Sequence, residues 1–377
     1  MQNKVRIAFC IERMDKPRGT ERALTSVANV LCDVFDVTVV TSSQGDNPDF
    51  FELDSRIKRF DIEIDTELRF NSVFYNRIMN DYRIKLTRYL KKERFDVVVA
   101  LSGLQFYFLH SIKDGSKKVA WFHFSYDISE HLLGNRFPSV MRKLLVSLHT
   151  KRRIRHARKY DKMVVVSKSN WEWWKERCSN VCFIYTPIAF STRHFSSLQN
   201  HAVIAVGSLT QEKGFDNLID AWGLVRERHP DWVLDIFGEG EMRSSLQNQI
   251  QNLNLSQCVF LKGRTAQIDK EYLEHSIFVL SSNTESFGLV LAEAAAFGLP
   301  LVAYKCKEVI GEIVENGKNG FLIETVGNKI DLADKVCALI EDDNLRHEMG
   351  RRAIETAKIF SIEELEKQWV DLLKSVV

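Results

Sequence analysis

Two glutamates separated by seven residues mark the stretch of this sequence with the clearest chemical content. Glu285 lies in a run of small polar residues, which predicts a loop, and Glu293 lies in a run rich in Ala and Leu. That second run has helical spacing and composition, so we predict a helix over residues 289–297. Gly298 and Pro300 follow it in the order that usually ends a helix.

The residues between the two glutamates suit an anion. The backbone N–H groups of Ser286, Phe287 and Gly288 lie at the expected start of the helix, where unpaired amides attract phosphate. Gly288 also lets a ligand approach the backbone closely. An anion site with a carboxylate on either side, each able to bond hydroxyls, is what a diphosphate attached to sugars needs. A buried helix that happens to carry two glutamates is the alternative.

A lysine precedes another predicted helix. Ala202–Gly207 is apolar and predicts a strand, and Lys213 and Gly214 then lie just before a helix with apolar residues at helical spacing. A lysine in this position can bind a diphosphate as a point charge. A surface charge beside a helix is the alternative. The next predicted strand ends before Gly238, whose Gly-x-Gly pattern is weak evidence by itself.

Two further candidates lie in the first half of the chain. His123 ends the apolar run that begins at Lys118, so it is expected at the carboxyl edge of a parallel sheet, where ligands bind in such folds. A packed loop histidine is the alternative. Gly19 lies in a polar loop that either approaches a ligand closely or forms a simple turn with Thr20 as the N-cap of the next helix.

The elements that would position these residues alternate between strand and helix. Short apolar runs separated by helical patterns predict an α/β chain with doubly wound parallel sheets. A length of 377 residues suggests about two domains, and the uneven polar segment 190–201 is the expected linker. The runs predicted as strands include 5–11, 37–41, 57–64, 95–101, 118–123, 163–167, 202–207, 232–237, 258–261, 277–281 and 301–304.

The motif from Glu285 to Pro300 resembles the donor site of retaining glycosyltransferases of family four, which have the GT-B architecture. It shares with them Glu–x7–Glu around Ser-Phe-Gly, then Ala-Glu-Ala and Gly-Leu-Pro. The resemblance extends over most of the chain and implies two Rossmann-like domains that face each other across a cleft. The expected boundaries are an acceptor domain at 1–190, a nucleotide-sugar domain at 191–361, and a C-terminal helix at 362–377 that crosses back to the first domain.

The resemblance also assigns roles to residues. His123, Lys213 and Glu285 are the implied catalytic residues: His123 faces the donor sugar, Lys213 binds the diphosphate and Glu285 bonds sugar hydroxyls. Glu293 is expected to bond the ribose. The implied donor-binding residues are Gly19, Gly207, Ser208, Gly238, Arg264, Ser286, Phe287, Gly288, Leu289 and Glu293.

One position departs from the family pattern. Ser208 stands where the family has an arginine, which removes one cation from the expected clamp. Lower activity, a different leaving group and compensation by Arg264 are the three alternatives. In the loop before the first helix, Thr20 replaces the second glycine of the family pattern, so close approach depends on Gly19 alone.

The implied activity is transfer of a hexose-type sugar from a nucleotide-diphosphate donor, with UDP the preferred nucleotide, to a lipid-linked or oligosaccharide acceptor in surface polysaccharide synthesis. We expect no cofactor, and no metal because no DxD-type motif lies in a suitable place. Three rivals stay open: a nucleotide-sugar epimerase, a glycosyl phosphorylase, and a degenerate transferase that serves as a binding subunit.

Composition limits the partners and the compartment. The net charge of +2 gives no global argument for nucleic acid, and no apolar run is long enough to span a bilayer. The seven cysteines form no CxxC pair, which is typical of reduced thiols, and no signal peptide precedes the first strand. We therefore expect a cytoplasmic protein.

One predicted helix is strongly basic. Ser139–Tyr160 contains eight Lys and Arg residues and no Asp or Glu. Such a helix can rest on the anionic inner surface of a membrane, and the alternative is a solvated charged face. Trp171, Trp173 and Trp174 could add an interfacial anchor or belong to the core.

Overall fold

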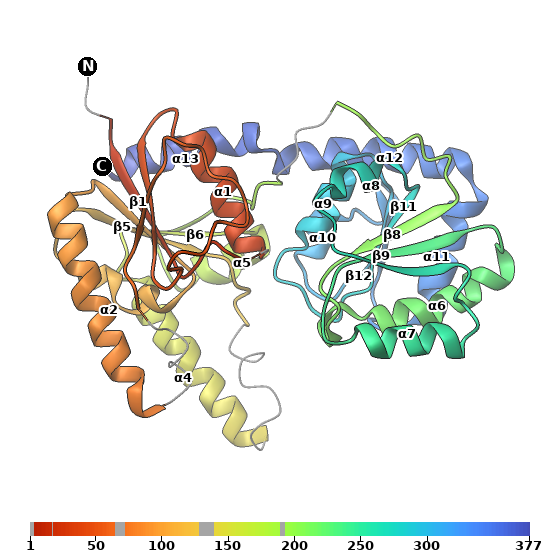
Figure 1. Cartoon of the computed structure of the whole chain (residues 1–377), viewed down its shortest axis with the longest axis horizontal. Helices are drawn as coiled ribbons and strands as arrows, with labels where there is room; N and C mark the ends of the chain where they lie inside the picture. The colour runs from red at the N-terminus through yellow and green to blue at the C-terminus, as the bar shows by residue number, and fades with distance from the viewer. Residues whose placement is uncertain (1–3, 17, 65–71, 128–138, 189–192) are drawn as a thin grey trace. The chain divides into compact units, whose positions relative to one another are not determined.

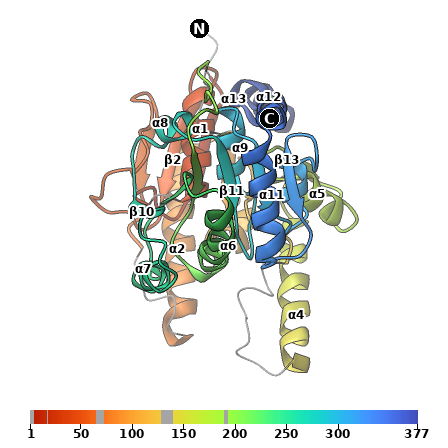
Figure 2. The same cartoon turned by 90° about the vertical axis from the view of Figure 1, so that its right-hand side faces the viewer.

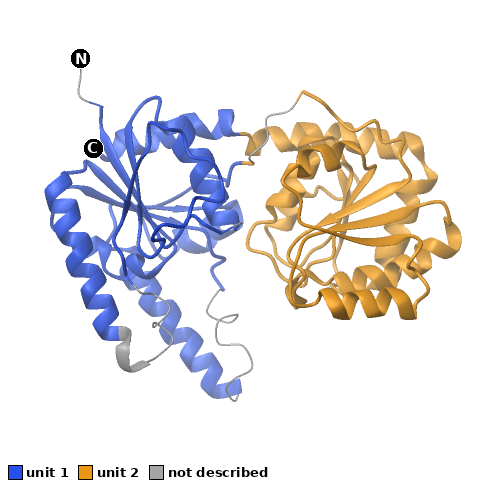
Figure 3. Cartoon of the chain, viewed as in Figure 1, with its two compact units in different colours: residues 1–187, 362–377 blue, residues 188–361 orange. Residues whose placement is uncertain are grey.

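The computed structural model describes residues 4–16, 18–64, 72–127, 139–188 and 193–377. The chain divides into two compact units, which Figure 3 shows in separate colours. Unit 1 combines Met1–Pro187 with the C-terminal segment Ile362–Val377, and unit 2 is the single segment Ile188–Ser361.

Unit 1 contains a parallel sheet of seven strands within the described residues, in the order β3-β2-β1-β4-β5-β6-β7. Its strands are β1 Arg6–Ile11, β2 Asp36–Thr41, β3 Lys58–Asp61, β4 Val97–Leu101, β5 Lys117–Phe122, β6 Lys162–Val165 and β7 Val181–Phe183. In the centre Ile7 pairs with Val37 on one side and with Val97 on the other. Helices cover both faces, so the central strands β1, β4 and β5 are apolar and buried except for the basic residues that begin β1 and β5.

Four described helices of unit 1 run back between successive strands, and a fifth comes after unit 2 in the sequence (Figure 1). They are α1 Gly19–Leu31, α2 Ser72–Glu93, α4 Ser139–Ala157, α5 Lys168–Lys175 and the C-terminal α13 Ile362–Val376. As the resemblance implied, α13 returns to the first unit. Its Trp369 is fully buried, and the ring centroid lies 4.5 Å from that of Trp121 on β5 in an edge-to-face arrangement.

Unit 2 repeats the same architecture with six strands in the order β10-β9-β8-β11-β12-β13, all parallel (Figure 2). Its strands are β8 Ala202–Val206, β9 Val233–Phe237, β10 Val259–Gly263, β11 Ile277–Leu280, β12 Leu301–Tyr304 and β13 Gly320–Ile323. Its helices are α6 Phe215–Arg228, α7 Arg243–Asn252, α8 Ile268–Leu273, α9 Leu289–Ala296, α10 Ile310–Ile313, α11 Lys329–Glu341 and α12 Asp343–Ala357.

The structure corrects several details of the sequence interpretation. The segment 57–64 contributes only four residues to a strand, β3. Thr20 is not an N-cap, because α1 begins one residue earlier and its N-cap is Arg18, which makes no side-chain capping bond. The strands β7 and β13 were not predicted, since each has only three or four residues and is only partly buried. The basic helix ends at Ala157 rather than Tyr160.

The three clustered tryptophans belong to the core of unit 1. Trp174 is fully buried, and Trp171 and Trp173 are partly buried and pack against the same cluster. The sequence left two interpretations of these tryptophans, an interfacial anchor or part of the core. The structure confirms that they belong to the core. Among the described residues, no helix is both long enough and apolar enough to cross a bilayer.

We predict that Trp369→Ala destabilises unit 1 and leaves unit 2 unchanged. A large side chain removed from a packed core costs about 3–5 kcal/mol of unfolding free energy. Urea denaturation followed by tryptophan fluorescence measures this loss, with Ile330→Ala, a change at a residue that is 66% exposed in unit 2, as the matched control. Equal midpoints for the Trp369 variant and the wild type would contradict the packing described here.

Candidate active site

The predicted donor residues of unit 2 follow four neighbouring strands at one edge of the sheet. Gly207 and Ser208 come after β8, Gly238 after β9, and Arg264 after β10. The loop 281–288 comes after β11, on the other side of β8. The strand order reverses between β8 and β11, and the crevice outside the carboxyl ends at such a point is where ligands bind in open α/β sheets.

The loops after β8 and β9 approach each other more closely than side chains would allow. The N–H of Gly207 donates to the carbonyl of Phe237 at 3.0 Å, and the N–H of Gly238 donates to the carbonyl of Gly263 at 2.8 Å. Gly238 has φ +149°, and a Cβ atom on it would lie 1.8 Å from the carbonyl oxygen of Gly207. Only glycine fits at position 238, so the Gly-x-Gly pattern, which is weak evidence by itself, marks a real close contact between these loops.

Lys213 and Glu285 form an ion pair at the same edge. The Lys213 ammonium donates to Oε1 of Glu285, and the hydroxyl of Ser282 donates to the same oxygen at 2.8 Å. The side chain of Glu285 is 9% exposed and that of Lys213 is 24% exposed. A partly buried pair of this kind is screened less than a surface pair, and both partners are held in one geometry.

Backbone contacts between two loops bring this pair together. The hydroxyl of Ser281 donates to the carbonyl of Lys213 at 3.0 Å. Asn283 bonds the preceding turn twice, with its N–H to Glu212 and its side-chain amide to Gln211, both at 2.8 Å. Gly214 has φ +60°, and a Cβ on it would lie 2.3 Å from the carbonyl oxygen of Ser281. The loop after β11 is therefore fastened to the turn that carries the lysine.

The start of α9 carries no side-chain cap. The helix begins at Leu289 and its N-cap is Gly288, which has φ +86° and makes no side-chain capping bond. Ser286 is exposed and Leu289 partly exposed. Phe287 is buried, with its ring edge-to-face on Phe360 at 5.7 Å between centroids. The aromatic residue of the motif thus anchors the loop in the core of unit 2.

Glu293 lies deeper than Glu285. It is 1% exposed, on the second turn of α9, and its Oε2 accepts a bond from the hydroxyl of Tyr272 at 3.4 Å. The structure therefore joins Lys213 to Glu285 and places Glu293 on the buried side of the helix, where Tyr272 orients its carboxylate.

In unit 1, His123 lies directly after β5, at the carboxyl edge as predicted. Its backbone N–H donates to the hydroxyl of Ser102, which follows β4, at 2.7 Å. Burial lowers the pKa of the imidazole to about 3, so the ring is neutral at physiological pH. Its ring centroid lies 4.5 Å from that of Trp121. Gly19, the other candidate in this unit, is exposed at the start of α1.

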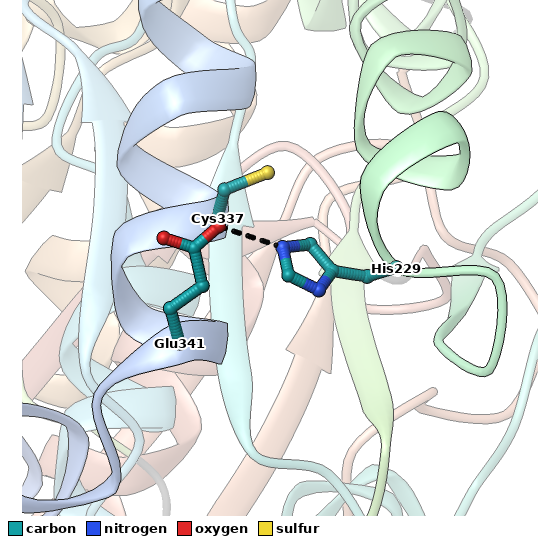
Figure 4. A group of neighbouring side chains, drawn as sticks. All are labelled: His229, Cys337 and Glu341. Atoms are coloured by element: carbon teal, nitrogen blue, oxygen red, sulfur yellow. Dashed lines mark hydrogen bonds and ion pairs between the residues drawn. The ribbon is translucent and has the colours of Figure 1, made fainter.

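The described residues contain one group with the composition of a metal site, His229, Cys337 and Glu341 (Figure 4). It belongs to α6 and α11, away from the carboxyl edge, because α6 ends where the chain returns to the start of β9. The guanidinium of Arg228 bonds Glu341 at 2.9 Å, and burial raises the pKa of the Cys337 thiol to about 11. A neighbouring cation and a protonated thiol both oppose metal binding.

Sequence reasoning missed the residues that hold the site residues in place. Ser102, Ser282 and Tyr272 each bond a predicted site residue. Ser102 is the first residue after β4 and Ser282 the second after β11, and a position just past a strand is a usable signal. Tyr272 has no such signal, because an aromatic residue in a short helix has the pattern of an ordinary core residue.

We predict that Gly238→Ala disrupts the edge of the sheet and weakens nucleotide binding at least tenfold, because the new methyl group must displace the Gly207 carbonyl. Gly223→Ala is the matched control: nothing lies within 4 Å of its Cβ, and alanine is the better helix former inside α6. Isothermal titration of UDP into both variants makes the comparison. Unchanged affinity in the Gly238 variant would show that this contact does not shape the site.

We predict that His123 stays neutral down to about pH 4. Its pKa in the folded protein lies below the ordinary value of about 6.5. The resulting contribution to stability is therefore complete above pH 6.5 and is lost as the pH falls toward 3. NMR titration of the ring protons tests this, with the signal assigned from its absence in His123→Gln. A midpoint near pH 6.5 would contradict the burial of the ring.

Family models match both units. Residues 17–189 match the model described as Glycosyltransferase Family 4, and residues 191–356 match the one described as Glycosyl transferases group 1. An uncharacterized glycosyltransferase of Haemophilus influenzae is 28% identical over 98% of this chain and 99% of its own length. A Campylobacter jejuni enzyme, named as an alpha-1,4-N-acetyl-D-galactosaminyltransferase acting on a glycan linked through diphosphate to undecaprenol, is 23% identical over 99% of both chains.

Solved structures share the fold at low identity. A mutant of S. aureus TarM in complex with Fondaparinux, alpha-GlcNAc-glycerol and UDP has a TM-score of 0.77 and 18% identity, covering 98% of this chain and 99% of its own. Anabaena HepE in complex with UDP and glucose has a TM-score of 0.75 and 21% identity, covering 98% and 100%. Family models over both units and neighbours over the whole fold give one conclusion: the chain is a glycosyltransferase of family four with the GT-B fold.

Proposed function

We propose that this enzyme is a retaining glycosyltransferase that moves a hexose-type sugar from a UDP-sugar to a lipid-linked or oligosaccharide acceptor in surface polysaccharide synthesis. The observation that carries the proposal is the Lys213–Glu285 pair. It lies at the strand-order reversal of unit 2, where the turn that carries Lys213 is fastened to the loop that carries Glu285 and leads into the start of α9. A cation, backbone amides and a carboxylate on two adjoining loops suit a diphosphate joined to a sugar.

The charge of the leaving group sets the chemical task. When the bond between the anomeric carbon and the diphosphate breaks, negative charge grows on the phosphate oxygens while the sugar becomes an oxocarbenium ion. Lys213 and the first amides of α9 stabilise that growing charge, which lowers the barrier more than it tightens substrate binding. Glu285 holds the ammonium in place and bonds the sugar hydroxyls, and Glu293, oriented by Tyr272, bonds the ribose.

Unit 1 supplies the acceptor side in this proposal. His123 lies at the carboxyl edge of its sheet, and its neutral ring offers a hydrogen bond without adding a positive charge to a cationic sugar. Gly19 at the start of α1 lies at the same edge, since α1 follows β1. By the family resemblance His123 contacts the donor sugar and the N–H of Gly19 helps to stabilise the charge on the leaving phosphate, and both roles stay predictions.

The relatives support the choice of donor and acceptor. The HepE structure contains UDP and glucose, the TarM structure contains UDP, and the name of the Campylobacter jejuni enzyme specifies an acceptor linked to undecaprenol. An acceptor of that type places the enzyme at the inner face of a membrane. Ser208 is exposed after β8 and Arg264 is exposed after β10, so compensation for the missing family arginine would come from a strand two positions away in the sheet.

We predict that Lys213→Ala lowers kcat for sugar transfer about 100- to 1,000-fold, the usual cost of removing one group that stabilises transition-state charge. Lys329→Ala is the matched control, because Lys329 is also paired with a carboxylate, Asp220, but lies at the start of α11. Release of nucleotide from a panel of UDP-, GDP- and ADP-sugars measures turnover, and NMR of the product shows whether the anomeric configuration is retained.

The outcomes separate the parts of the proposal. Wild-type turnover in the Lys213 variant would remove the lysine from the mechanism, and an inverted product would exclude the retaining assignment. Conversion of a UDP-sugar to its epimer with no acceptor present would replace the transferase by an epimerase. Absence of any nucleotide binding in the wild type would favour the degenerate binding subunit.

A further inference from the structure

Tyr126, three residues after His123, is bonded on both sides of its backbone. Its N–H donates to Oδ1 of Asn170 on α5 at 2.9 Å, and its carbonyl accepts a bond from Nη2 of Arg153 on α4 at 2.7 Å. Its ring stacks on that of Trp173, also on α5, with 5.3 Å between the centroids and 13° between the planes. Two helices therefore fix one residue of the loop that carries His123, and Arg153 and Asn170 together form the Tyr126 clamp.

The side chain of Asn170 is oriented for its bond to the loop. Asn170 is 3% exposed, and its Nδ2 donates to the hydroxyl oxygen of Ser167, the N-cap of α5, at 3.0 Å. The backbone N–H of Asn170 donates to the same oxygen at 3.2 Å. Because the N–H of Tyr126 can only donate, the amide must turn its oxygen toward Tyr126 and its nitrogen toward Ser167. The cap of α5 thus sets the geometry of the bond to the loop.

Arg153 is a costly residue in this position. It is 4% exposed, burial lowers its pKa, and no carboxylate among the described residues pairs with it. Nη2 also bonds the hydroxyl of Thr150 at 3.4 Å, and the guanidinium lies 5.9 Å from the ring centroid of Phe122. Nε and Nη1 are buried with no partner in the described part of the chain. An apolar side chain of similar size often stabilises a fold as well as a buried charge does, so stability alone does not account for this arginine.

The ring of His123 has no hydrogen bond that would set its orientation. Nε2 is buried, and within the residues that the structure describes neither ring nitrogen has a partner. The ring packs against Trp121, and the backbone N–H of His123 donates to Ser102. The loop is fixed a second time at Tyr126. The position of the imidazole therefore depends on a segment of four residues that is held at both ends.

We propose that Arg153 and Asn170 are positioning residues for His123. By fixing Tyr126 from α4 and α5, they hold the imidazole in the place from which it contacts the reacting sugar. A side chain in an active site commonly takes its orientation from hydrogen-bonded neighbours, and for His123 the clamped backbone has this task. The inference rests on the proposed function only for the contact between His123 and the sugar.

NMR of the histidine-labelled full chain measures the position of the ring without any substrate. The ring current of Trp121, whose centroid lies 4.5 Å away, shifts the signals of the His123 ring. These signals are assigned by their absence in His123→Gln. In Arg153→Met and in Asn170→Ala we expect them to lose most of this shift and to move toward the values of a mobile histidine.

The kinetic effect should fall on turnover. We expect kcat for sugar transfer to decrease about 10- to 100-fold in both variants, because a misplacement of about 1 Å can cost about 100-fold in rate. KM for the UDP-sugar should stay within about twofold, because the donor residues of unit 2 are unchanged. Arg153→Lys keeps a donor for the Tyr126 carbonyl, so it should recover most of kcat and most of the ring-current shift.

Two controls remove similar bonds elsewhere in unit 1. Arg158→Met removes an arginine whose Nε donates to the backbone carbonyl of Arg177 at 2.8 Å. Asn180→Ala removes an amide that donates to the carbonyls of Ala157 and Tyr160 at 3.0 and 2.7 Å. These bonds hold the end of α4 and the residues just after it, and none of them involves the loop after β5. Both controls should match wild type in the ring signals and in kcat.

The proposal is overturned if the ring signals of both clamp variants equal those of wild type, or if the controls shift them as much. It is also overturned if urea denaturation shows unit 1 unfolded in both Arg153→Met and Arg153→Lys, because the arginine would then act through stability. Displaced ring signals with unchanged kcat would confirm the clamp and remove His123 from sugar transfer. The failure of the proposed function is therefore distinguishable from the failure of the clamp.

Discussion

The contact between the carbonyl of Ser281 and the bare Cα of Gly214 is the constraint on which the donor side depends. No side chain can occupy residue 214, so the loop after β11 reaches the turn that ends in Lys213. Bonds from Ser281 and Asn283 then fix the distance between the loops. The ammonium and the Glu285 carboxylate meet as a consequence of backbone packing, and a rigid backbone contact costs no side-chain entropy when substrate binds.

The two units have the same architecture but carry different charges at the carboxyl edges of their sheets. In unit 2 the carboxyl edge carries an ion pair beside the positive end of a helix, which suits an anionic leaving group. In unit 1 the corresponding edge carries a buried, neutral His123, and the positive charge is carried by α4 instead.

The sequence predicts the fold and much of the donor loop because both depend on local patterns. Short apolar runs that alternate with helical patterns indicate central parallel strands, and Gly288 before an Ala-rich segment marks a helix start. The contacts that hold the site are not local: Tyr272 reaches Glu293 across 21 positions, and Lys213 reaches Glu285 across 72. The sequence suggested a basic helix at 139–160, but only the packing of Arg153 shows which of its faces remains exposed.

The return of α13 to unit 1 makes unit 2 an insertion between the two parts of unit 1. During synthesis the ribosome completes the whole of unit 2 before it adds Trp369, so the core of unit 1 is completed only after unit 2 has been made. A chain cut before residue 369 would lack a buried tryptophan of the first unit although the break lies beyond the second. Unit 2, which is one continuous segment, is the part of this enzyme that an expression fragment could contain whole.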